Sequence, residues 1–313
     1  MTIPEAPSSL LLRAAAQAAA GQHHPASALY VVATPIGNLA DITLRALHVL
    51  SLVDAVACED TRHSAALLRH YGLHKPLLAL HEHNEREAAQ QVLARLAAGE
   101  RVAFVSDAGT PAVSDPGARL VAMAHAAGHA VVPLPGASAA LAALSVAGDV
   151  QSGGFQFVGF LPPKARELEA ALREIAARPV AQILFEAPHR IEALAAALAQ
   201  VCPARALTVC RELTKQFETV AAMAAGELAA WLAADAQRRR GEFVLVLHGQ
   251  PVAAEAPLVR AEPALRALLA ALPLKQAVAL AAELSGAPRN ALYERALELR
   301  RESNESEDQG ADG

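Results

Sequence analysis

Three segments of the sequence combine proline, glycine and small polar residues in a pattern that suits a ligand-binding loop. They span residues 33–41, 105–117 and 134–138, and each directly follows a run of apolar residues. Glycine and alanine let the backbone approach a ligand closely, while the side chains of Asp107 and Thr110 can hydrogen-bond to it. Composition alone leaves two interpretations open: a set of ligand-binding loops, or three ordinary tight turns.

Two further segments, residues 184–190 and 210–218, gather charged side chains directly after predicted strands. Their charged residues are Glu186, Arg190, Arg211, Glu212, Lys215 and Glu218. Arginine and lysine can hold a phosphate or stabilise a developing negative charge. The same residues can also form a salt-bridge network between two domains, so these segments indicate either an anion site or an interdomain contact.

Alternating strands and helices must position these segments. Apolar runs predict strands at 29–33, 54–58, 77–80, 102–106 and 130–134. Helical spacing of apolar residues predicts helices at 41–53, 64–71, 85–98, 116–127 and 138–146, with Asp41 as the first N-cap. Such alternation is typical of a mostly parallel sheet covered on both faces. Because parallel strands end at one edge, where ligands bind, the three small-residue segments are better explained as ligand-binding loops.

Residues 148–154, with two adjacent glycines and no periodicity, mark the boundary to a second α/β unit. Its strands are predicted at 155–160, 181–185, 206–210 and 242–247, with 217–220 as a fifth candidate. Its helices are predicted at 165–177, 191–201 and 225–234. Beyond a Pro/Ala-rich linker, three short helices at 262–272, 274–284 and 289–300 resemble a helix-turn-helix; a helical packing or dimerisation appendage is the alternative.

The ends of the chain differ in composition from the folded part. We divide the sequence into 1–28, a flexible N-terminal extension; 29–150 and 151–250, the two α/β domains; 251–259, a linker; 260–301, the helical domain; and 302–313, a disordered acidic tail. Residues 9–20 lack the basic stretch that precedes the apolar core of a signal peptide. The formal charge of −5 comes from the tail, whose removal leaves 27 acids against 27 bases. Overall charge therefore neither supports nor excludes a nucleic-acid partner, although residues 260–301 carry seven bases and four acids.

Several function classes are excluded by what the sequence lacks. It has no G-x-x-x-x-G-K-[ST] phosphate loop, no G-x-G-x-x-G turn after its first predicted strand, and no H-E-x-x-H or G-x-S-x-G motif. The cysteines Cys58, Cys202 and Cys210 lie far apart and lack metal-ligand spacing, so we expect neither a disulfide framework nor a bound metal. No stretch stays apolar for the roughly 18 residues of a membrane span, so we expect no membrane partner.

At its loops the sequence resembles the tetrapyrrole methylase superfamily, the class III S-adenosylmethionine (SAM)-dependent methyltransferases. Within it, the resemblance is to the branch that methylates the ribose 2′-hydroxyl of a decoding-centre cytidine, cytidine 1402, in 16S rRNA. The resemblance extends over about residues 29–250. Its blocks are residues 33–41, 58–62, 105–117, 133–138, 185–190 and 211–218. The C-terminal helices also resemble the helix-turn-helix-like appendage of that branch.

The resemblance implies an α/β fold of two domains of the tetrapyrrole methylase type, with SAM in the cleft between them, plus the small C-terminal helical (helix-turn-helix-like) domain. It further implies a cytoplasmic homodimer that acts on 16S rRNA or the 30S ribosomal subunit. Most relatives have Gly-Asp-Pro in the second loop, where this sequence has Gly109-Thr110-Pro111, so that carboxylate's contact is left to Thr110 or Asp107. The residues expected to bind the cofactor are Pro35, Gly37, Asp107, Gly109, Thr110, Val113, Gly136, Ala137, Leu184 and Phe185.

Methyl transfer from SAM is an in-line displacement in which the protein mainly aligns the reactants, without a metal. Because a ribose 2′-hydroxyl is a poor nucleophile, a nearby base or a positive group that stabilises the alkoxide would help. The candidate catalytic residues are Glu59, Asp60, Arg211, Glu212 and Lys215. The candidate RNA-binding residues are Arg190, Lys215, Lys275 and Arg289. The basic candidates serve either the chemistry or phosphate binding.

Two other functions stay open beside rRNA methylation. One is a tetrapyrrole (precorrin-type) C-methyltransferase, which the same scaffold can support; the charged blocks 58–62 and 211–218 and the basic helices are not needed for a small porphyrinoid. The other is a non-catalytic ribosome-binding relative. The small residues of the loops argue against it, because a lost cofactor site would tolerate larger side chains there.

Overall fold

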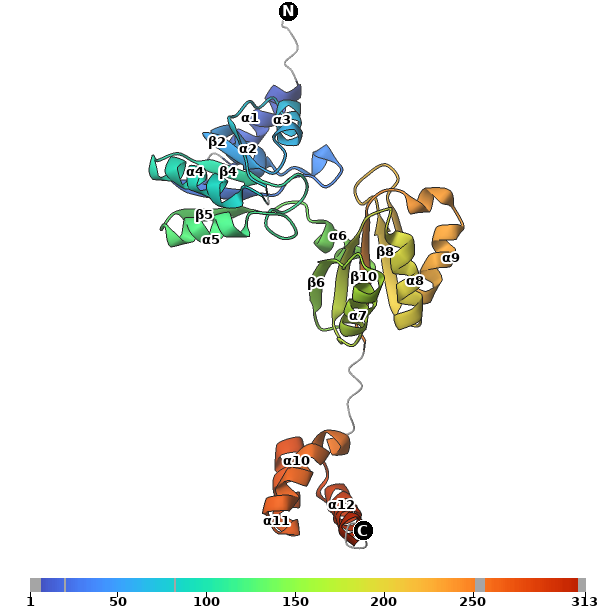
Figure 1. The fold of residues 1–313 in the computed structure, drawn as a ribbon. Coiled ribbons are helices and arrows are strands. Elements are labelled where there is room, and N and C mark those ends of the chain that lie inside the picture. Colours follow the sequence, from blue (N-terminus) through green and yellow to red (C-terminus); the bar gives the residue numbers. More distant parts are fainter. Residues whose placement is uncertain (1–6, 20, 82, 251–256, 309–313) are drawn as a thin grey trace, which may run out of the picture. The chain divides into compact units, whose positions relative to one another are not determined.

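The first half of the chain forms a five-stranded parallel sheet (Figure 1). The computed structural model describes residues 7–19, 21–81, 83–250 and 257–308. The strands are β1 (Ala28–Val32), β2 (Ala55–Cys58), β3 (Leu77–Ala79), β4 (Val102–Val105) and β5 (Ala130–Leu134), in the spatial order β3-β2-β4-β1-β5. Every pairing among them is parallel, which confirms the prediction. The three strands that precede the small-residue loops, β4, β1 and β5, are neighbours in the sheet.

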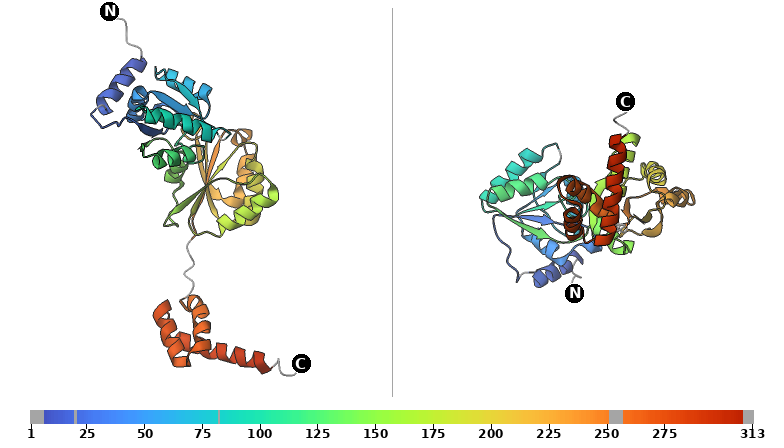
Figure 2. Two further views of the ribbon diagram at one scale, coloured as in Figure 1. Left: turned by 60° about the vertical axis from the view of Figure 1, so that its left-hand side comes forward. Right: turned by 90° about the horizontal axis from the view of Figure 1, so that it is seen from below.

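Helices cover both faces of this sheet (Figures 1 and 2). They are α2 (Leu44–Leu52), α3 (Thr61–His70), α4 (Glu85–Ala97) and α5 (Ala118–Ala126). Successive side chains of a strand point to opposite faces. In β4, Ala103 and Val105 therefore pack into one core with α2 and α3, while Val102 and Phe104 pack into another with α4 and α5.

Helix α2 begins later than predicted. Its N-cap is Thr43 rather than Asp41, because the Thr43 hydroxyl accepts a hydrogen bond from the backbone N–H of Ala46 at 3.1 Å. Asp41 instead ends a short 3-10 helix that precedes it, Leu39–Asp41.

The N-terminal segment, which the sequence predicted to be a flexible extension, contains helix α1 (Pro7–Ala19) packed on α2. Ala15 is fully buried, and Leu11 and Leu12 pack against the same core. The prediction was wrong because a short alanine-rich helix gains its stability from packing on the rest of the fold, and local composition does not show whether such packing occurs.

The second half of unit 1 (residues 1–249) forms a mixed five-stranded sheet. Its strands are β6 (Phe155–Phe160), β7 (Ala181–Glu186), β8 (Ala206–Arg211), β9 (Thr219–Ala224) and β10 (Phe243–Leu247), in the order β6-β7-β10-β8-β9. Only β6 and β7 pair in parallel. Strand β9 lies further along the chain than the candidate at 217–220. One face is covered by α7 (Ala165–Ala176), α8 (Ile191–Val201) and α9 (Leu228–Ala233).

Helix α6 (Ala139–Ala147) covers the other face of this second sheet. The sequence placed it in the N-terminal domain, but its buried alanines, Ala140, Ala143 and Ala147, pack with residues of β7 and β10. The chain therefore crosses from the first sheet to the second at the third small-residue loop, before the predicted boundary at 148–154. That loop joins the two sheets directly.

Unit 2 is a compact three-helix piece formed by α10 (Pro257–Ala271), α11 (Leu274–Ser285) and α12 (Arg289–Asp308). Its core includes Leu265, Val278 and Leu292. Most of the predicted linker, residues 251–256, lies outside the described residues, and the predicted tail is helical as far as Asp308, with 309–313 also outside them. Within the described ranges, every helix is too short or too polar to cross a membrane.

Candidate active site

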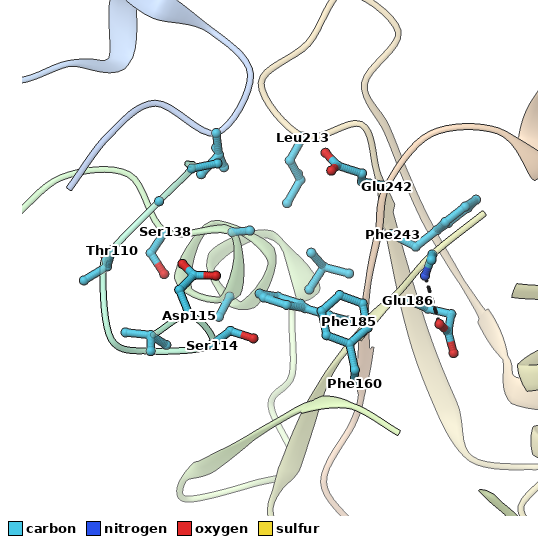
Figure 3. Close-up of a pocket in the computed structure, with 18 of the residues that line it drawn as sticks. Thr110, Ser114, Asp115, Ser138, Phe160, Phe185, Glu186, Leu213, Glu242 and Phe243 are labelled. Atoms are coloured by element: carbon cyan, nitrogen blue, oxygen red, sulfur yellow. Dashed lines mark hydrogen bonds between the residues drawn. The ribbon is translucent and has the colours of Figure 1, made fainter. Parts of the chain in front are cut away.

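A cavity of about 340 Å³ lies at the carboxyl edge of the first sheet, facing β6, β7 and β10 of the second (Figure 3). The first-sheet loops contribute small and polar groups to its wall, among them Gly109, Thr110, Asp115 and Ser138. The second sheet contributes charged groups and aromatic rings, among them Phe160, Phe185, Glu186, Lys215 and Glu242. The volume lies in the range of cavities that hold small organic ligands.

Hydrogen bonds join the three small-residue loops to one another. Thr34, after β1, and Gly109, after β4, exchange two backbone hydrogen bonds of 2.9 and 3.0 Å. The Thr110 hydroxyl donates to the carbonyl of Ala137, after β5, at 3.2 Å. The loops therefore form one connected rim, and Thr110 uses its donor within that rim.

Small residues are required where these loops approach each other. Gly109 has a φ of 80°, a left-handed conformation that side chains rarely adopt. A β-carbon on Gly136 would lie 2.9 Å from the β-carbon of Ala33, closer than two carbons can approach. The rim thus has a shape that larger side chains would distort.

The structure places the predicted cofactor residues at different depths. Gly109, Thr110, Val113 and Phe185 lie in the cavity wall. Four others flank wall residues along the chain: Pro35 and Gly37 lie on either side of Ile36, and Gly136 and Ala137 precede Ser138. Asp107 precedes Ala108, and its carboxylate accepts from the backbone N–H of Asp60 at 3.2 Å. Leu184 lies elsewhere, fully buried in the core beneath α7 and α8.

A group of carboxylates lies behind the second loop. Burial and the neighbouring charges of Asp107 and Asp115 raise the pKa of Glu59. Burial likewise raises the pKa of Asp115, although a hydrogen bond from Ser106 opposes this. Hydrogen bonds from Arg62 lower the pKa of Asp60, which is the N-cap of α3. Glu59 and Asp60 are not among the wall residues, whereas Asp115 is.

Lys215 is the positive group of the wall, and two carboxylates hold it. Its Nζ lies 2.8 Å from Glu212 Oε1 and 2.7 Å from Glu242 Oε2. Burial alone would lower the pKa of Lys215, but these two hydrogen bonds outweigh that effect and raise it. Burial similarly opposes the hydrogen bonds that lower the pKa of Glu212. Lys215 is therefore a fixed cation at neutral pH, not a proton acceptor.

The loop that carries Lys215 is strained and firmly held. Glu212 and Thr214 adopt φ values of 53° and 67°, which non-glycine residues seldom do. Arg211 is buried beneath the loop and donates from Nε to the carbonyl of Arg240 at 2.6 Å and from Nη1 to that of Phe217 at 3.2 Å. Strained backbone that neighbouring contacts enforce is common at functional sites. Arg211 thus supports the loop instead of facing the cavity.

The remaining basic candidates lie in different surroundings. Arg190 is engaged by protein groups, with its Nε 3.1 Å from Glu186 Oε1 and its Nη2 donating to the carbonyl of Leu161. Lys275 and Arg289 are exposed on unit 2, at the starts of α11 and α12. The ion pairs of Glu186 and Glu212 form within the second sheet's own loops, so they do not make the interdomain network that the sequence left open.

Asp115, Phe160 and Glu242 are among the wall residues that were not singled out from the sequence. Asp115 belongs to the second small-residue segment and could have been included with it. Phe160 and Glu242 lie at the ends of predicted strands, and only the order of the strands in the sheet places those ends at the cavity.

Comparisons with known proteins agree with this geometry. The family model described as Tetrapyrrole (Corrin/Porphyrin) Methylases matches residues 28–229, and the model described as RsmI C-terminal HTH domain matches residues 255–300. The chain is 49% identical over 271 residues to a protein named ribosomal RNA small subunit methyltransferase I from Escherichia coli O157:H7, covering 86% of this chain and 94% of that protein. A protein of the same name from Pseudomonas aeruginosa is 49% identical over 276 residues, covering 87% and 98%.

Among solved structures, the chain resembles the methyltransferase CobJ, with a TM-score of 0.53 and 21% identity over 71% of this chain and 93% of that one. It also resembles cobalt precorrin-4 methyltransferase, with a TM-score of 0.51 and 16% identity over 70% and 94%. At these identities the likeness concerns the fold.

Proposed function

Because the chain belongs to the tetrapyrrole methylase family, in the branch of relatives named ribosomal RNA small subunit methyltransferase I, we propose that it methylates the ribose 2′-hydroxyl of cytidine 1402 in 16S rRNA. The methyl donor of this family is S-adenosylmethionine. The family and the rRNA class of substrate follow from relatives that are about half identical over nearly their whole length. The nucleotide and the 2′-oxygen come from the resemblance of the loops, and they are the parts that need a test.

The residues of the cavity suit this cofactor. The rim formed by the three loops has the small residues that let a backbone wrap closely around a ligand, and Ser138 and Asp115 present polar groups to the same space. When bound, SAM supplies a methyl group on a positively charged sulfur, and this sulfur is the leaving group when a nucleophile attacks the methyl carbon in line. The protein's own task is then to hold the acceptor oxygen in line and to exclude water.

The observation that carries the choice of an oxygen acceptor is Lys215. Glu212 and Glu242 fix its ammonium in the wall and accept two of its three N–H donors, which leaves the third to donate to the oxygen of a hydroxyl as that hydroxyl gives up its proton to solvent. A preorganised cation stabilises an alkoxide, which a carbon acceptor does not form. Glu212 positions Lys215, and Arg211 positions the loop; Glu59 and Asp60 lie outside the wall, so we give them a role in holding the second loop.

We assign part of the RNA binding to unit 2, with Lys275 and Arg289 as phosphate contacts. The proposed assembly is a homodimer. A helix-turn-helix-like domain that presents basic side chains is suited to nucleic acid. Arg190, whose guanidinium is occupied by Glu186 and Leu161, is better suited to shaping the cavity than to holding phosphate.

The test is methyl transfer with labelled SAM to three acceptors: 30S subunits that lack the modification, naked 16S rRNA, and uroporphyrinogen. We expect label in RNA, in a dinucleotide that resists alkaline hydrolysis because its 2′-oxygen is blocked. Label only in the porphyrinoid would refute the proposal, and label on a base would refute the 2′-oxygen. Gly109→Trp should abolish SAM binding, because Gly109 has a left-handed backbone in the cavity wall.

A further inference from the structure

Phe217 is an exposed aromatic ring next to the candidate active site. It lies two residues after Lys215, and 69% of it is exposed to solvent. Apolar area stabilises a fold only where it is removed from water, so this ring contributes little to the core. An exposed aromatic beside a cavity is a common feature of surfaces that bind another molecule.

Hydrogen bonds hold the backbone of the loop that carries this ring. The Phe217 carbonyl accepts from the buried guanidinium of Arg211, and the backbone N–H of Thr214 donates to Glu218 Oε2 at 2.6 Å. The left-handed conformations at Glu212 and Thr214 restrict the loop further. An aromatic side chain on a backbone that is already ordered loses less conformational entropy when a partner stacks on it, which makes it an effective binding group.

The same guanidinium of Arg211 also fixes the next loop, through the carbonyl of Arg240. Arg240 is the last of three consecutive arginines and is exposed. Arg238 lies over the Trp231 ring at 4.6 Å, and Arg239 pairs with Glu192 at 3.2 Å. In the described part of unit 1, Arg240 has no carboxylate partner, so its charge is available to a ligand.

We propose that Phe217 stacks on a base of the RNA substrate at the mouth of the active site, and that Arg240 contacts the adjoining phosphate. The proposal rests on the proposed function for the identity of the ligand as RNA. A ribose hydroxyl enters a cavity of this kind only when its nucleotide leaves its stacked neighbours. An aromatic face replaces the lost stacking, and single-stranded RNA is recognised in this way, with arginine on its backbone.

Two substitutions separate stacking from apolar packing. Phe217→Ala should lower kcat/KM for 30S subunits about 5- to 160-fold, the usual loss when one base–aromatic stack is removed. Phe217→Leu should lose as much, because it stays apolar but has no ring face, whereas Phe217→Trp should stay within about threefold of wild type. Affinity for SAM should not change. Phe155→Ala is the matched control, since Phe155 is also exposed but starts β6, at the opposite end of the strand from the wall residue Phe160.

A measurement of RNA binding tests the stacking of Phe217 without relying on methyl transfer. Trp231 is the single tryptophan of the wild-type chain, so Phe217→Trp adds one reporter. Titration with a single-stranded cytidine-containing RNA oligonucleotide should quench the variant more strongly than wild type. Quenching without methyl transfer by any protein would refute the proposed function and leave the stacking site standing. The stacking proposal would be overturned by equal quenching in both proteins or by full activity of Phe217→Leu. A change of oligomeric state in Phe217→Ala would also overturn it, because the ring would then contact a second copy of the chain.

Discussion

Gly37, in the first loop, makes a close approach to the side chain of Lys215. A β-carbon at position 37 would lie 2.5 Å from Lys215 Cγ and 3.0 Å from Cε. Carbon atoms in contact normally stand about 3.5–4.0 Å apart, so Gly37→Ala must displace the stem of Lys215 by about 1 Å. Because Cγ is close to the backbone, rotation at the far end of the side chain cannot relieve the clash. The substitution therefore moves the ammonium without removing it.

The expected effect is on the rate of methyl transfer. A shift of about 1 Å in a positioned group costs roughly 100-fold in rate, equivalent to about 2.7 kcal/mol. Gly37 is exposed, but its φ of 157° is a backbone conformation that side chains rarely adopt, so the substitution also costs about 1–3 kcal/mol of unfolding free energy. We therefore expect kcat to fall about 100-fold and the unfolding temperature to fall by about 2–12 °C, so that the protein is still folded in the assay.

The assay is single-turnover methyl transfer to 30S subunits at saturating SAM, with SAM affinity measured separately. Gly128→Ala is the matched control, because it is also exposed and strained by a positive φ, here 78°, but its β-carbon would meet nothing within 4 Å. A rate within threefold of wild type for Gly37→Ala would refute the positioning of Lys215 as the source of catalysis. A fall in unfolding temperature far beyond that of Gly128→Ala would assign the loss to the fold instead.

Three other predictions concern the charge of Lys215, the buried Arg205 and unit 2. The pKa of Lys215 is raised, so its charge is fully present below the ordinary lysine value of about 10.4 and is lost only as the pH rises through the higher folded value. A pH–rate profile should therefore show no alkaline decline of kcat below about pH 10. Glu242→Gln removes one of the two carboxylates that raise this pKa, so it should move the decline to lower pH. Arg205 is buried and donates to three carbonyl oxygens, so Arg205→Ala should reduce the free energy of unfolding in urea by about 3 kcal/mol; a loss below 1 kcal/mol would contradict this. Deleting residues 250–313, a separate compact unit, should raise KM for 30S subunits far more than KM for SAM, and an equal rise in both would indicate a structural role.

The fold was largely predictable because its information is local. Runs of apolar residues of strand length, separated by helical spacing, fixed the five parallel strands of the first sheet. Two errors have one cause: α1 and α6 are alanine-rich, and alanine favours a helix without specifying what the helix packs on. Helix α6 follows the first sheet in the sequence but packs on the second, through Ala140, Ala143 and Ala147. That choice of partner is a long-range property of the chain.

The parts of the site that depend on backbone shape were the parts that the sequence predicted. Gly109 and Gly136 are marked by residue type, because their positions demand a small residue. Leu184 and Phe185 are adjacent in one strand and therefore face opposite sides, and the sequence alone does not say which side faces the cavity. The charged residues were equally ambiguous, since an arginine that supports a loop, such as Arg211, has the same identity as one that meets a ligand.

The two sides of the cavity perform separable tasks, and this separation constrains kinetics. The first-sheet loops act through backbone shape, so a bulky residue at Gly109 should raise KM for the cofactor as well as lower the rate. The loop of Lys215 acts through a fixed charge, so its loss should lower kcat with little change in cofactor affinity, because an alkoxide exists only near the transition state. Gly37 belongs to the first group by its place in the sequence and to the second by its contact. If Gly37→Ala behaves like a Lys215 variant and not like a Gly109 variant, contact rather than sequence position determines its role, and the small residue at 37 serves the acceptor side of the reaction.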